Sequence, residues 1–430
     1  MKIKNTFIFT LFLIIIFFSN SISYADTTVV LDNNLDLLSE SAILIDSKNG
    51  NVLYGKNENQ QMYPASTTKI LTAIIAIENC SLTDKISASR NAIMSIPSGY
   101  SNANIKVNEE LTVQELLEVF LVHSANEAGF ILAEHISGSI ENFADLMNQK
   151  ASEIGCKNTH FTNPSGIHNP EHYSTAYDMA LIARYCMQNQ TFRDIVSKPS
   201  CTIETTDVSE KRYFVNTNDL IRQSSKYYYD YAIGIKTGYT SQAKNCLIAG
   251  SLKDNLELIT VVLGSPSSAT NTTSPRYSDT INLFNYGFDN YELKDIIKEN
   301  DSVTSISVKN ATKDTKELDL ISKNSIEVAL PNNIDISQID SSIVLNENIT
   351  APIAKDTVLG SISYNIDGIN YSTELVASHD VIKNDVKLLL MQITSAIFVL
   401  IVLTFLLSDK KKKNKKYKDY DSIYKFQRRK

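Results

Sequence analysis

The sequence predicts an α/β (α+β) domain with an antiparallel sheet and a helical cluster, followed by a small all-β domain and a C-terminal transmembrane helix. Three observations predict this arrangement. Strand patterns lie at both ends of the first domain with helical patterns between them, short alternating segments follow, and a long apolar run precedes a lysine-rich end. With 430 residues, 43% of them hydrophobic, the chain is long enough for two or more domains.

The N-terminus is predicted to be a secretory signal peptide. Residues 1–25 combine two lysines, an apolar run from Phe7 to Phe18 and the end Ser23-Tyr24-Ala25. This pattern is typical of a signal peptide cleaved after Ala25. An uncleaved N-terminal anchor is the alternative, but the apolar run is short for a membrane span.

The predicted first domain covers residues 26–295 and begins with a β-hairpin around Asn49-Gly50, a strong hairpin signal. Three strand patterns lie at its far end, and the last two are joined by the tight connection Lys253-Asp254-Asn255, which implies antiparallel neighbours. The strands are expected at 42–45, 52–54, 232–236, 246–252 and 256–263, and the helices at 66–77, 115–122, 141–154, 174–187 and 277–286.

Residues 300–380 are predicted to form the small all-β domain. From Val303 to Val376 the chain has short alternating segments, such as 362–366 and 371–375, which are separated by turn residues such as Asp367-Gly368. We expect this domain to lie between the first domain and the membrane.

Residues 388–407 are predicted to cross a membrane. They are almost uniformly apolar, and at about 1.5 Å per residue they reach roughly 30 Å, the thickness of a bilayer core. The lysine-rich residues 408–430 then form a basic cytoplasmic tail, which places everything before the span outside the cell. An interfacial amphipathic helix is the alternative, but the apolar side chains surround the helix and form no stripe.

Charge and cysteine content exclude several classes of protein. The formal net charge of −7 includes the basic tail, so the exported part is more acidic still, and no basic patch indicates nucleic acid. The lysine tail alone could be a nucleic-acid arm, but beside a span it is more simply a topology signal. The five cysteines show no C-x-x-C and no histidine at metal-ligand spacing, so we expect buried free thiols.

Three short motifs carry chemistry, in the order Ser66-x-x-Lys69, Ser124-x-Asn126 and Lys236-Thr237-Gly238. At the start of a helix, Ser66 and Lys69 lie one turn apart on one face, which can hold a nucleophile beside a base. Each motif occurs easily by chance. Together, on a helix, an interhelical loop and a strand, they match the set S-x-x-K, S-x-N and K-T-G of penicillin-interacting serine enzymes.

On these motifs the chain resembles the low-molecular-mass penicillin-binding proteins that act as serine-type D-Ala-D-Ala carboxypeptidases, whose catalytic domain has a β-lactamase/transpeptidase-like fold. Further matching stretches lie at 151–155, 161–166, 172–178, 236–240 and 285–288. The chain departs from the pattern at Ser124-Ala125-Asn126-Glu127, where many members have Gly and Asp around the Asn. The motif's own Ser and Asn are retained.

The catalytic roles follow from the groups and from the resemblance. Acyl transfer needs a nucleophile, a base and donors for the oxyanion, and Ser66 is the candidate nucleophile. Lys69 can be the base only if it is neutral, and both burial and the nearby cation of Lys236 lower its pKa. The resemblance assigns Ser124 to relay the proton to the leaving amine, and Asn126 to orient Lys69 and bind the substrate backbone.

The remaining predicted site residues bind the substrate. Gly238 lets a peptide lie against the strand edge, and Thr237 can donate a hydrogen bond to its terminal carboxylate. The resemblance places the oxyanion hole at the backbone N–H groups of Ser66 and Tyr239. It also places Arg276, seven residues before Leu283, near the carboxylate, and an exposed arginine at a helix start is the alternative.

The resemblance therefore implies a membrane-anchored enzyme on the cell-wall side. It would remove the terminal D-Ala from peptidoglycan stem peptides through an acyl-enzyme and be acylated by β-lactams, with no metal or organic cofactor. The alternatives are an endopeptidase or transpeptidase acting on the same peptides, a β-lactamase, and a catalytically silent cell-wall binding protein. No convincing glutamate motif for the deacylating water of a β-lactamase is present.

Overall fold

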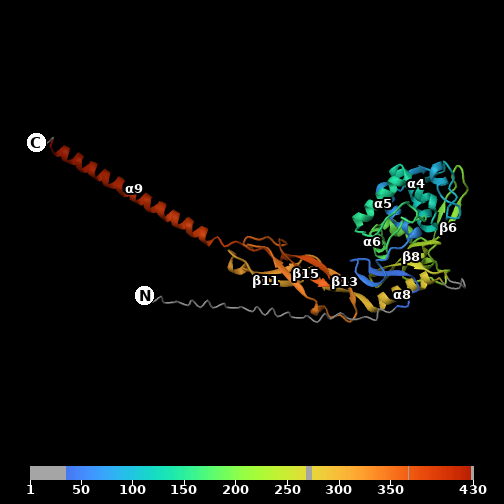
Figure 1. Ribbon diagram of the computed structural model, residues 1–430. Coiled ribbons are helices and arrows are strands. Elements are labelled where there is room, and N and C mark those ends of the chain that lie inside the picture. The colour runs from blue at the N-terminus through green and yellow to red at the C-terminus, as the bar shows by residue number, and fades with distance from the viewer. Residues whose placement is uncertain (1–34, 268–273, 367, 428–430) are drawn as a thin grey trace, which may run out of the picture.

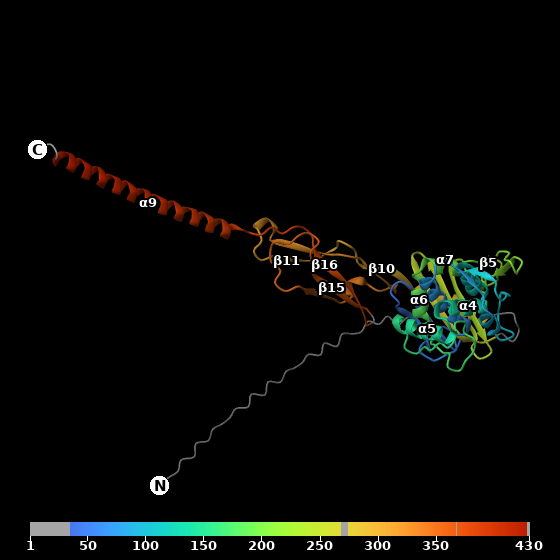
Figure 2. The same ribbon diagram turned by 90° about the horizontal axis from the view of Figure 1, so that it is seen from above.

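The computed structural model describes residues 35–267, 274–366 and 368–427. The described chain is elongated, with an α/β unit at one end, a β-domain in the middle and a long helix at the other end (Figure 1). The view from above shows the same order along the molecule (Figure 2). The predicted signal peptide, residues 1–25, lies outside the described residues.

The α/β unit is built on a five-stranded antiparallel sheet with the strand order β2-β1-β9-β8-β7. The predicted Asn49-Gly50 hairpin is present and pairs through β1 with β9, so the two ends of the unit meet in one sheet. β7 lies at the sheet edge, and one side of it is therefore open to other partners. The strands are β1 Ser41–Asp46, β2 Val52–Lys56, β7 Ala232–Thr240, β8 Lys244–Lys253 and β9 Leu256–Ser265.

The sheet is buried on both faces, as the alternation within β1 shows. Ile43 and Ile45 pack into the helical cluster, whereas Ala42 and Leu44 face the opposite core, against α8 (Pro275–Asn290). Side chains of such a strand point alternately to two buried faces, and its central residues from Ala42 to Ile45 are accordingly all apolar. This explains why the whole of β1 is buried.

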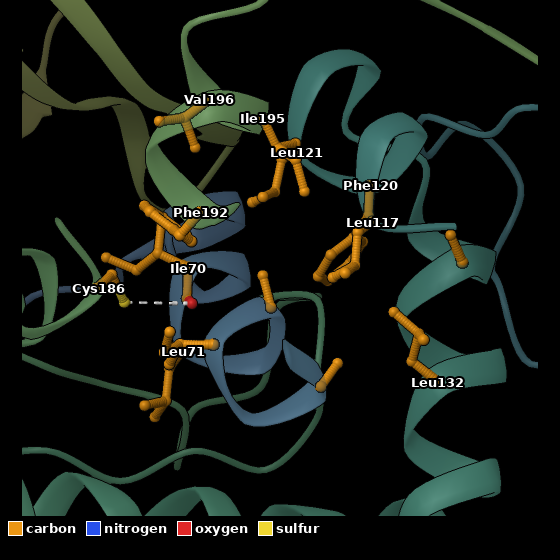
Figure 3. Packing of buried hydrophobic residues seen from close by; sticks show 14 of the residues in the cluster. Ile70, Leu71, Leu117, Phe120, Leu121, Leu132, Cys186, Phe192, Ile195 and Val196 are labelled. Carbon is orange, nitrogen blue, oxygen red and sulfur yellow. Dashed lines mark hydrogen bonds between the residues drawn. The ribbon is translucent and has the colours of Figure 1, made fainter. Parts of the chain in front are cut away.

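The helical cluster surrounds α1 (Lys69–Asn79), whose residues from Lys69 to Ala76 are all buried. Ile70 and Leu71 of α1 lie among buried side chains of other helical segments, such as Leu117, Leu132 and Phe192 (Figure 3). The cluster consists of α1, α2 Arg90–Met94, α3 Val113–Glu118, η2 Val119–His123, α4 Asn126–Ser137, α5 Ile140–Ile154, α6 Ala176–Met187 and α7 Gln190–Val196.

Short elements complete the unit. Two small two-stranded sheets flank the helical cluster, and single 3-10 turns lead into α1 and precede β7. These elements are η1 Ala65–Thr68, β3 Lys85–Ser87, β4 Glu110–Thr112, β5 Ser200–Ile203, β6 Arg212–Val215 and η3 Asp219–Ile221.

Several helices differ from the sequence prediction, and the short helices α2 and α7 lie outside the predicted helical ranges. The predicted helix 115–122 is α-helical only to Glu118 and continues as a π-turn, η2, which ends at Ser124 in the left-handed conformation. α4 was not predicted. All its residues from Asn126 to Ala133 are buried, so it lacks the alternation of apolar and polar faces that identifies a surface helix.

The predicted all-β domain is confirmed as a five-stranded antiparallel sheet, with the order β11-β12-β16-β15-β14, and a two-stranded sheet of β10 and β13. Lys48 and Asn49, in the β1–β2 turn, contact Glu327 of this domain, with Lys48 Nζ 2.5 Å from Glu327 Oε2. The strands are β10 Tyr291–Ile297, β11 Ser302–Ser307, β12 Glu317–Ser322, β13 Ile326–Pro331, β14 Ser341–Leu345, β15 Val358–Ile366 and β16 Ile369–Ala377, and the 3-10 turns are η4 Lys313–Thr315 and η5 Ile336–Gln338.

The last helix, α9 (Val386–Gln427), contains the predicted membrane segment 388–407 and extends into the lysine-rich tail. Its residues 389–414 are long and apolar enough to cross a membrane by length and composition. It points away from the α/β unit in both views (Figures 1 and 2). The domain boundaries given above, 26–295 and 300–380, stay predictions, and β10 lies across the junction between them.

Candidate active site

Ser66 and Lys69 are brought together by the tight turn η1 that leads into α1. Ser66 lies in η1, Lys69 is the first residue of α1, and the Lys69 Nζ atom is 2.9 Å from the Ser66 Oγ atom. Ala65 just before them has a φ of 49°, a left-handed conformation that costs a non-glycine residue about 1 kcal/mol. The backbone next to Ser66 is therefore strained, as is common at functional sites.

The loop 161–166 packs directly on this strained turn. A Cβ atom at Gly166, whose φ is +74°, would come within 1.8 Å of the Ala65 carbonyl oxygen. Only glycine permits this close approach. The loop thereby places the carbonyl oxygen of Ser165 2.7 Å from Lys69 Nζ.

Lys69 is fully buried and is held by neutral acceptors. Its Nζ atom donates hydrogen bonds to the Asn126 Oδ1 atom and to the Ser165 carbonyl oxygen, each at 2.7 Å. The pKa of Lys69 lies well below its ordinary value, mainly because burial disfavours the charged form and secondly because of the cation of Lys236. The carboxylate of Glu127 acts in the opposite direction.

The Ser124-x-Asn126 motif lies where the π-turn η2 passes into α4. Ser124 has a φ of 70° and ends η2, and Asn126 is the first residue of α4. Besides accepting from Lys69, Asn126 donates from Nδ2 to the Ser101 carbonyl oxygen at 2.7 Å. Both the oxygen and the nitrogen of its side-chain amide are thus hydrogen-bonded, and two different segments set the orientation of Asn126.

The Lys236-Thr237-Gly238 motif lies on the edge strand β7. A Cβ atom at Gly238 would be 3.0 Å from the Ser66 backbone nitrogen, so the strand passes directly beside the serine. Lys236 is buried beneath it, and burial, with a smaller contribution from the cation of Arg276, lowers its pKa to about 7. The Thr237 Oγ1 atom forms a 2.6 Å hydrogen bond with the Thr217 hydroxyl.

Arg276 is the second residue of α8 and is half-buried against the same strand. Its Nη1 atom donates to the Gly238 carbonyl oxygen at 3.5 Å, and its guanidinium lies 4.8 Å from the ring centre of Tyr277. The Tyr277 hydroxyl in turn donates to the Thr217 carbonyl oxygen. Arg276 is therefore positioned at the cleft and not on an open surface.

These segments enclose one cleft. Lys69 and Lys236 lie below its floor, and the other predicted residues line it together with Thr217, Gln242 and the loop 98–101. The predicted lining residues are Ser66, Ser124, Asn126, Thr237, Gly238, Tyr239 and Arg276. The structure thus brings together all nine residues that the sequence singled out.

Sequence reasoning missed Ser165 and Thr217. Ser165 contributes a backbone carbonyl to Lys69, and a carbonyl leaves no residue-type signal. Thr217 lies in Asn216-Thr217-Asn218, which resembles an ordinary polar turn. Within the described part of the chain, no group of three or more His, Cys, Asp or Glu side chains could hold a metal ion, and all five cysteines are free.

The contacts of Lys69 determine what the cleft can do. A neutral amine has two N–H donors and one lone pair. The carbonyl oxygens of Asn126 and Ser165 can take both donors, which leaves the lone pair for the hydroxyl of Ser66. Fold and cleft together define a class of protein, the serine acyl-transfer enzymes in which a lysine contacts the candidate nucleophile.

Comparison with known proteins identifies the family. Residues 27–267 match the family model of D-alanyl-D-alanine carboxypeptidases, peptidase family S11, and residues 291–383 match that of the penicillin-binding protein 5 C-terminal domain. The chain belongs to the S11 family. The predicted resemblance and fold class are thus confirmed.

Individual relatives agree with this assignment. The chain is 34% identical to the D-alanyl-D-alanine carboxypeptidase DacF of Bacillus subtilis, over 81% of this chain and 86% of that one. The structure of penicillin-binding protein 5 from Haemophilus influenzae matches with a TM-score of 0.66 and 28% identity, over 81% of this chain and 99% of that one. The Streptomyces K15 DD-transpeptidase matches with a TM-score of 0.55 and 29% identity, over 60% of this chain and 99% of that one.

Proposed function

We propose that this protein is a serine-type D-Ala-D-Ala carboxypeptidase that removes the terminal D-Ala from peptidoglycan stem peptides and is acylated by β-lactams. Family membership supports the activity, and one observation carries the mechanism: the Lys69 amine is buried between two carbonyl acceptors and the Ser66 hydroxyl.

Acylation begins with transfer of the Ser66 proton to the lone pair of Lys69. Burial and the cation of Lys236 keep Lys69 neutral, so the lone pair is free to accept the proton. Once protonated, the ammonium is stabilised by the carbonyl oxygens of Asn126 and Ser165. The Ser66 oxygen then attacks the carbonyl carbon of the substrate's last peptide bond.

Different groups of the cleft stabilise the oxyanion and protonate the leaving amine. The backbone N–H groups of Ser66 and Tyr239 are the proposed oxyanion donors, because β7 passes beside the Ser66 nitrogen at Gly238. Ser124 lines the same cleft and relays the proton to the departing D-Ala nitrogen. Water then hydrolyses the acyl-enzyme and frees Ser66.

The terminal carboxylate of the substrate is bound by Thr237 and by the two cations nearby. The Thr237 hydroxyl and Arg276 line the cleft, and Lys236 lies directly beneath. A carboxylate next to Lys236 favours its charged form, so substrate binding raises the pKa of Lys236 above its value of about 7 in the free enzyme.

We further propose that the protein is anchored by α9 with the α/β unit on the cell-wall side. The segment Leu389–Asn414, which is mainly apolar up to Leu407, supports a membrane span. The lysines that follow support a cytoplasmic tail, since cytoplasmic flanks are enriched in basic residues. The β-domain then separates the cleft from the membrane surface (Figure 2).

The test is to label the full-length protein in detergent with fluorescent penicillin and to measure D-Ala release from a pentapeptide. We expect stable labelling and release for the wild type and for a Ser363→Ala control in the β-domain, and neither for Ser66→Ala. No labelling of the wild type would favour a silent binding protein. Prompt loss of the label would favour a β-lactamase. Transfer of the peptide's acyl group to an added amine would favour a transpeptidase.

A further inference from the structure

A second hollow adjoins the cleft beyond the end of strand β7. It is lined by Glu40, Tyr63, Tyr173, Gln242 and Lys244, among others, and Gln242 lines the cleft as well. The two depressions therefore meet at Gln242. Nothing in the acyl-transfer chemistry described above uses this second hollow, which we call the Glu40–Lys244 hollow.

The hollow presents one charge of each sign. The Lys244 Nζ atom lies 2.5 Å from the Glu40 Oε1 atom, and the two side chains are 49% and 44% exposed. An ion pair this exposed contributes little to stability and opens readily when another partner is available. The hollow can therefore offer a carboxylate and an ammonium to a ligand at the same time.

The direction of a bound stem peptide follows from the position of its carboxylate. With the carboxylate at Thr237 and Arg276, a peptide that pairs antiparallel with the open edge of β7 has its N-terminal residues toward Thr240 and Gln242. The part of the substrate that remains on Ser66 after acylation therefore points at the Glu40–Lys244 hollow.

The distances fit the third residue of the stem peptide. Gln242 is four residues beyond Gly238, at most about 13 Å along an extended strand. The third residue precedes the acylated D-Ala by one position, about 3.5 Å, and a long side chain adds roughly 6 Å. Residues 241–243 form a turn, so Gln242 lies nearer than this limit of about 13 Å. A reach of about 9.5 Å brings the end of a long side chain toward the rim of the hollow, whereas a short side chain ends well before it.

We propose that the Glu40–Lys244 hollow binds the end of the third-residue side chain and selects a diamino acid whose side chain carries both an ammonium and a carboxylate. Glu40 pairs with the ammonium and Lys244 with the carboxylate, so the ligand replaces one ion pair by two. A side chain that ends in an amine alone pairs with the Glu40 carboxylate and leaves the Lys244 ammonium without a carboxylate partner. This inference rests on the proposed function.

The test compares D-Ala release from two pentapeptides that differ only in the third residue, meso-diaminopimelate or L-lysine, using the full-length protein. We expect kcat/KM to be about fivefold higher for the diaminopimelate peptide, because each exposed charge contact contributes modestly. Glu40→Gln and Lys244→Met should reduce this ratio to near one. N-acetyl-D-Ala-D-Ala, which has no third residue, should be released equally by all variants.

The matched control is the ion pair of Lys323 and Glu374 in the β-domain, whose atoms are 2.6 Å apart and whose side chains are each 50% exposed. Lys323→Met and Glu374→Gln should keep the wild-type ratio. If wild type releases D-Ala from both pentapeptides at equal kcat/KM, or if the Glu40 and Lys244 variants keep the preference, the hollow does not select the third residue. Absence of release from all three substrates would instead overturn the proposed function.

Discussion

The α/β unit and the β-domain differ in whether they bury ionisable side chains. The α/β unit buries two lysines, several carboxylates and a histidine. In the described residues of the β-domain, the buried polar side chains are those of Ser322 and Thr373, neither of which ionises. Burying a charged group costs free energy. The difference therefore shows that the α/β unit gives up stability to place ionisable groups in its interior.

The partners of the buried groups sharpen this contrast. Asp178 accepts hydrogen bonds from two backbone N–H groups and the Thr159 hydroxyl, and Asp279 accepts from Ser39, so both support structure. Lys69 and Lys236 have carbonyl oxygens as their hydrogen-bond acceptors instead. A cation held this way is easily discharged, and the pKa values of both lysines are lowered.

The largest effect is expected for Lys69→Met, which keeps the volume of the side chain and removes the base. We expect the second-order rate constant of penicillin acylation to fall by about a thousandfold, within the range of general-base catalysis. Stopped-flow fluorescence with labelled penicillin measures this rate. Lys323→Met in the β-domain should leave it unchanged, and a loss below about tenfold for Lys69→Met would mean that another group is the base.

A smaller effect is expected for Arg276→Leu. Loss of a charged hydrogen bond to the substrate carboxylate should lower kcat/KM for a pentapeptide by about tenfold. Because the cation of Arg276 lowers the pKa of Lys236, its removal should also move the titration of Lys236 to higher pH. An alkaline limb of kcat/KM that stays in place would contradict the coupling of these two cations.

The pH profile of the wild type tests both lysines. On the acid side kcat/KM should fall as Lys69 takes up a proton, at a pH well below the ordinary titration range of lysine. On the alkaline side it should decline above pH about 7, as Lys236 loses its charge. Bound substrate favours the Lys236 cation, so the alkaline limb of kcat should lie at higher pH than that of kcat/KM.

The smallest effect on catalysis is expected in the β-domain. Leu375 is fully buried in its core, so Leu375→Ala should destabilise this domain by about 2–5 kcal/mol. Its unfolding transition, followed by calorimetry of the full-length protein, should move to lower temperature. Release of D-Ala from a soluble pentapeptide below that transition should be unchanged, and a parallel loss of activity would show that the two regions are not independent.

The sequence predicted the side chains of the candidate site better than the backbone around them. Ser66, Lys69, Ser124, Asn126 and Lys236 belong to motifs of residue type and spacing, which are visible in one dimension. The left-handed Ala65 and the Ser165 carbonyl depend on the loop 161–166 packing on η1, a contact between distant segments. Such a contact leaves no local pattern in the sequence.

The fold shows the same limit. The antiparallel strands and the helices with mixed apolar and polar positions could be predicted, as α5 with its end at Gly155 illustrates. α4 and the π-turn before it could not, because a segment buried on all sides has no periodic stripe. These two elements position Ser124 and Asn126, so part of the site rests on elements that the sequence did not predict.

The central claim is that Lys69 is a neutral amine in the free enzyme. The most direct measurement is NMR of the full-length protein with its lysine side chains labelled at Cε, in which the Lys69 signal is assigned by its absence from Lys69→Met. We predict the signal of a neutral amine at pH 7 and a titration well below the ordinary range of lysine. An ammonium signal that persists at pH 7 and titrates near the ordinary lysine value would contradict this account.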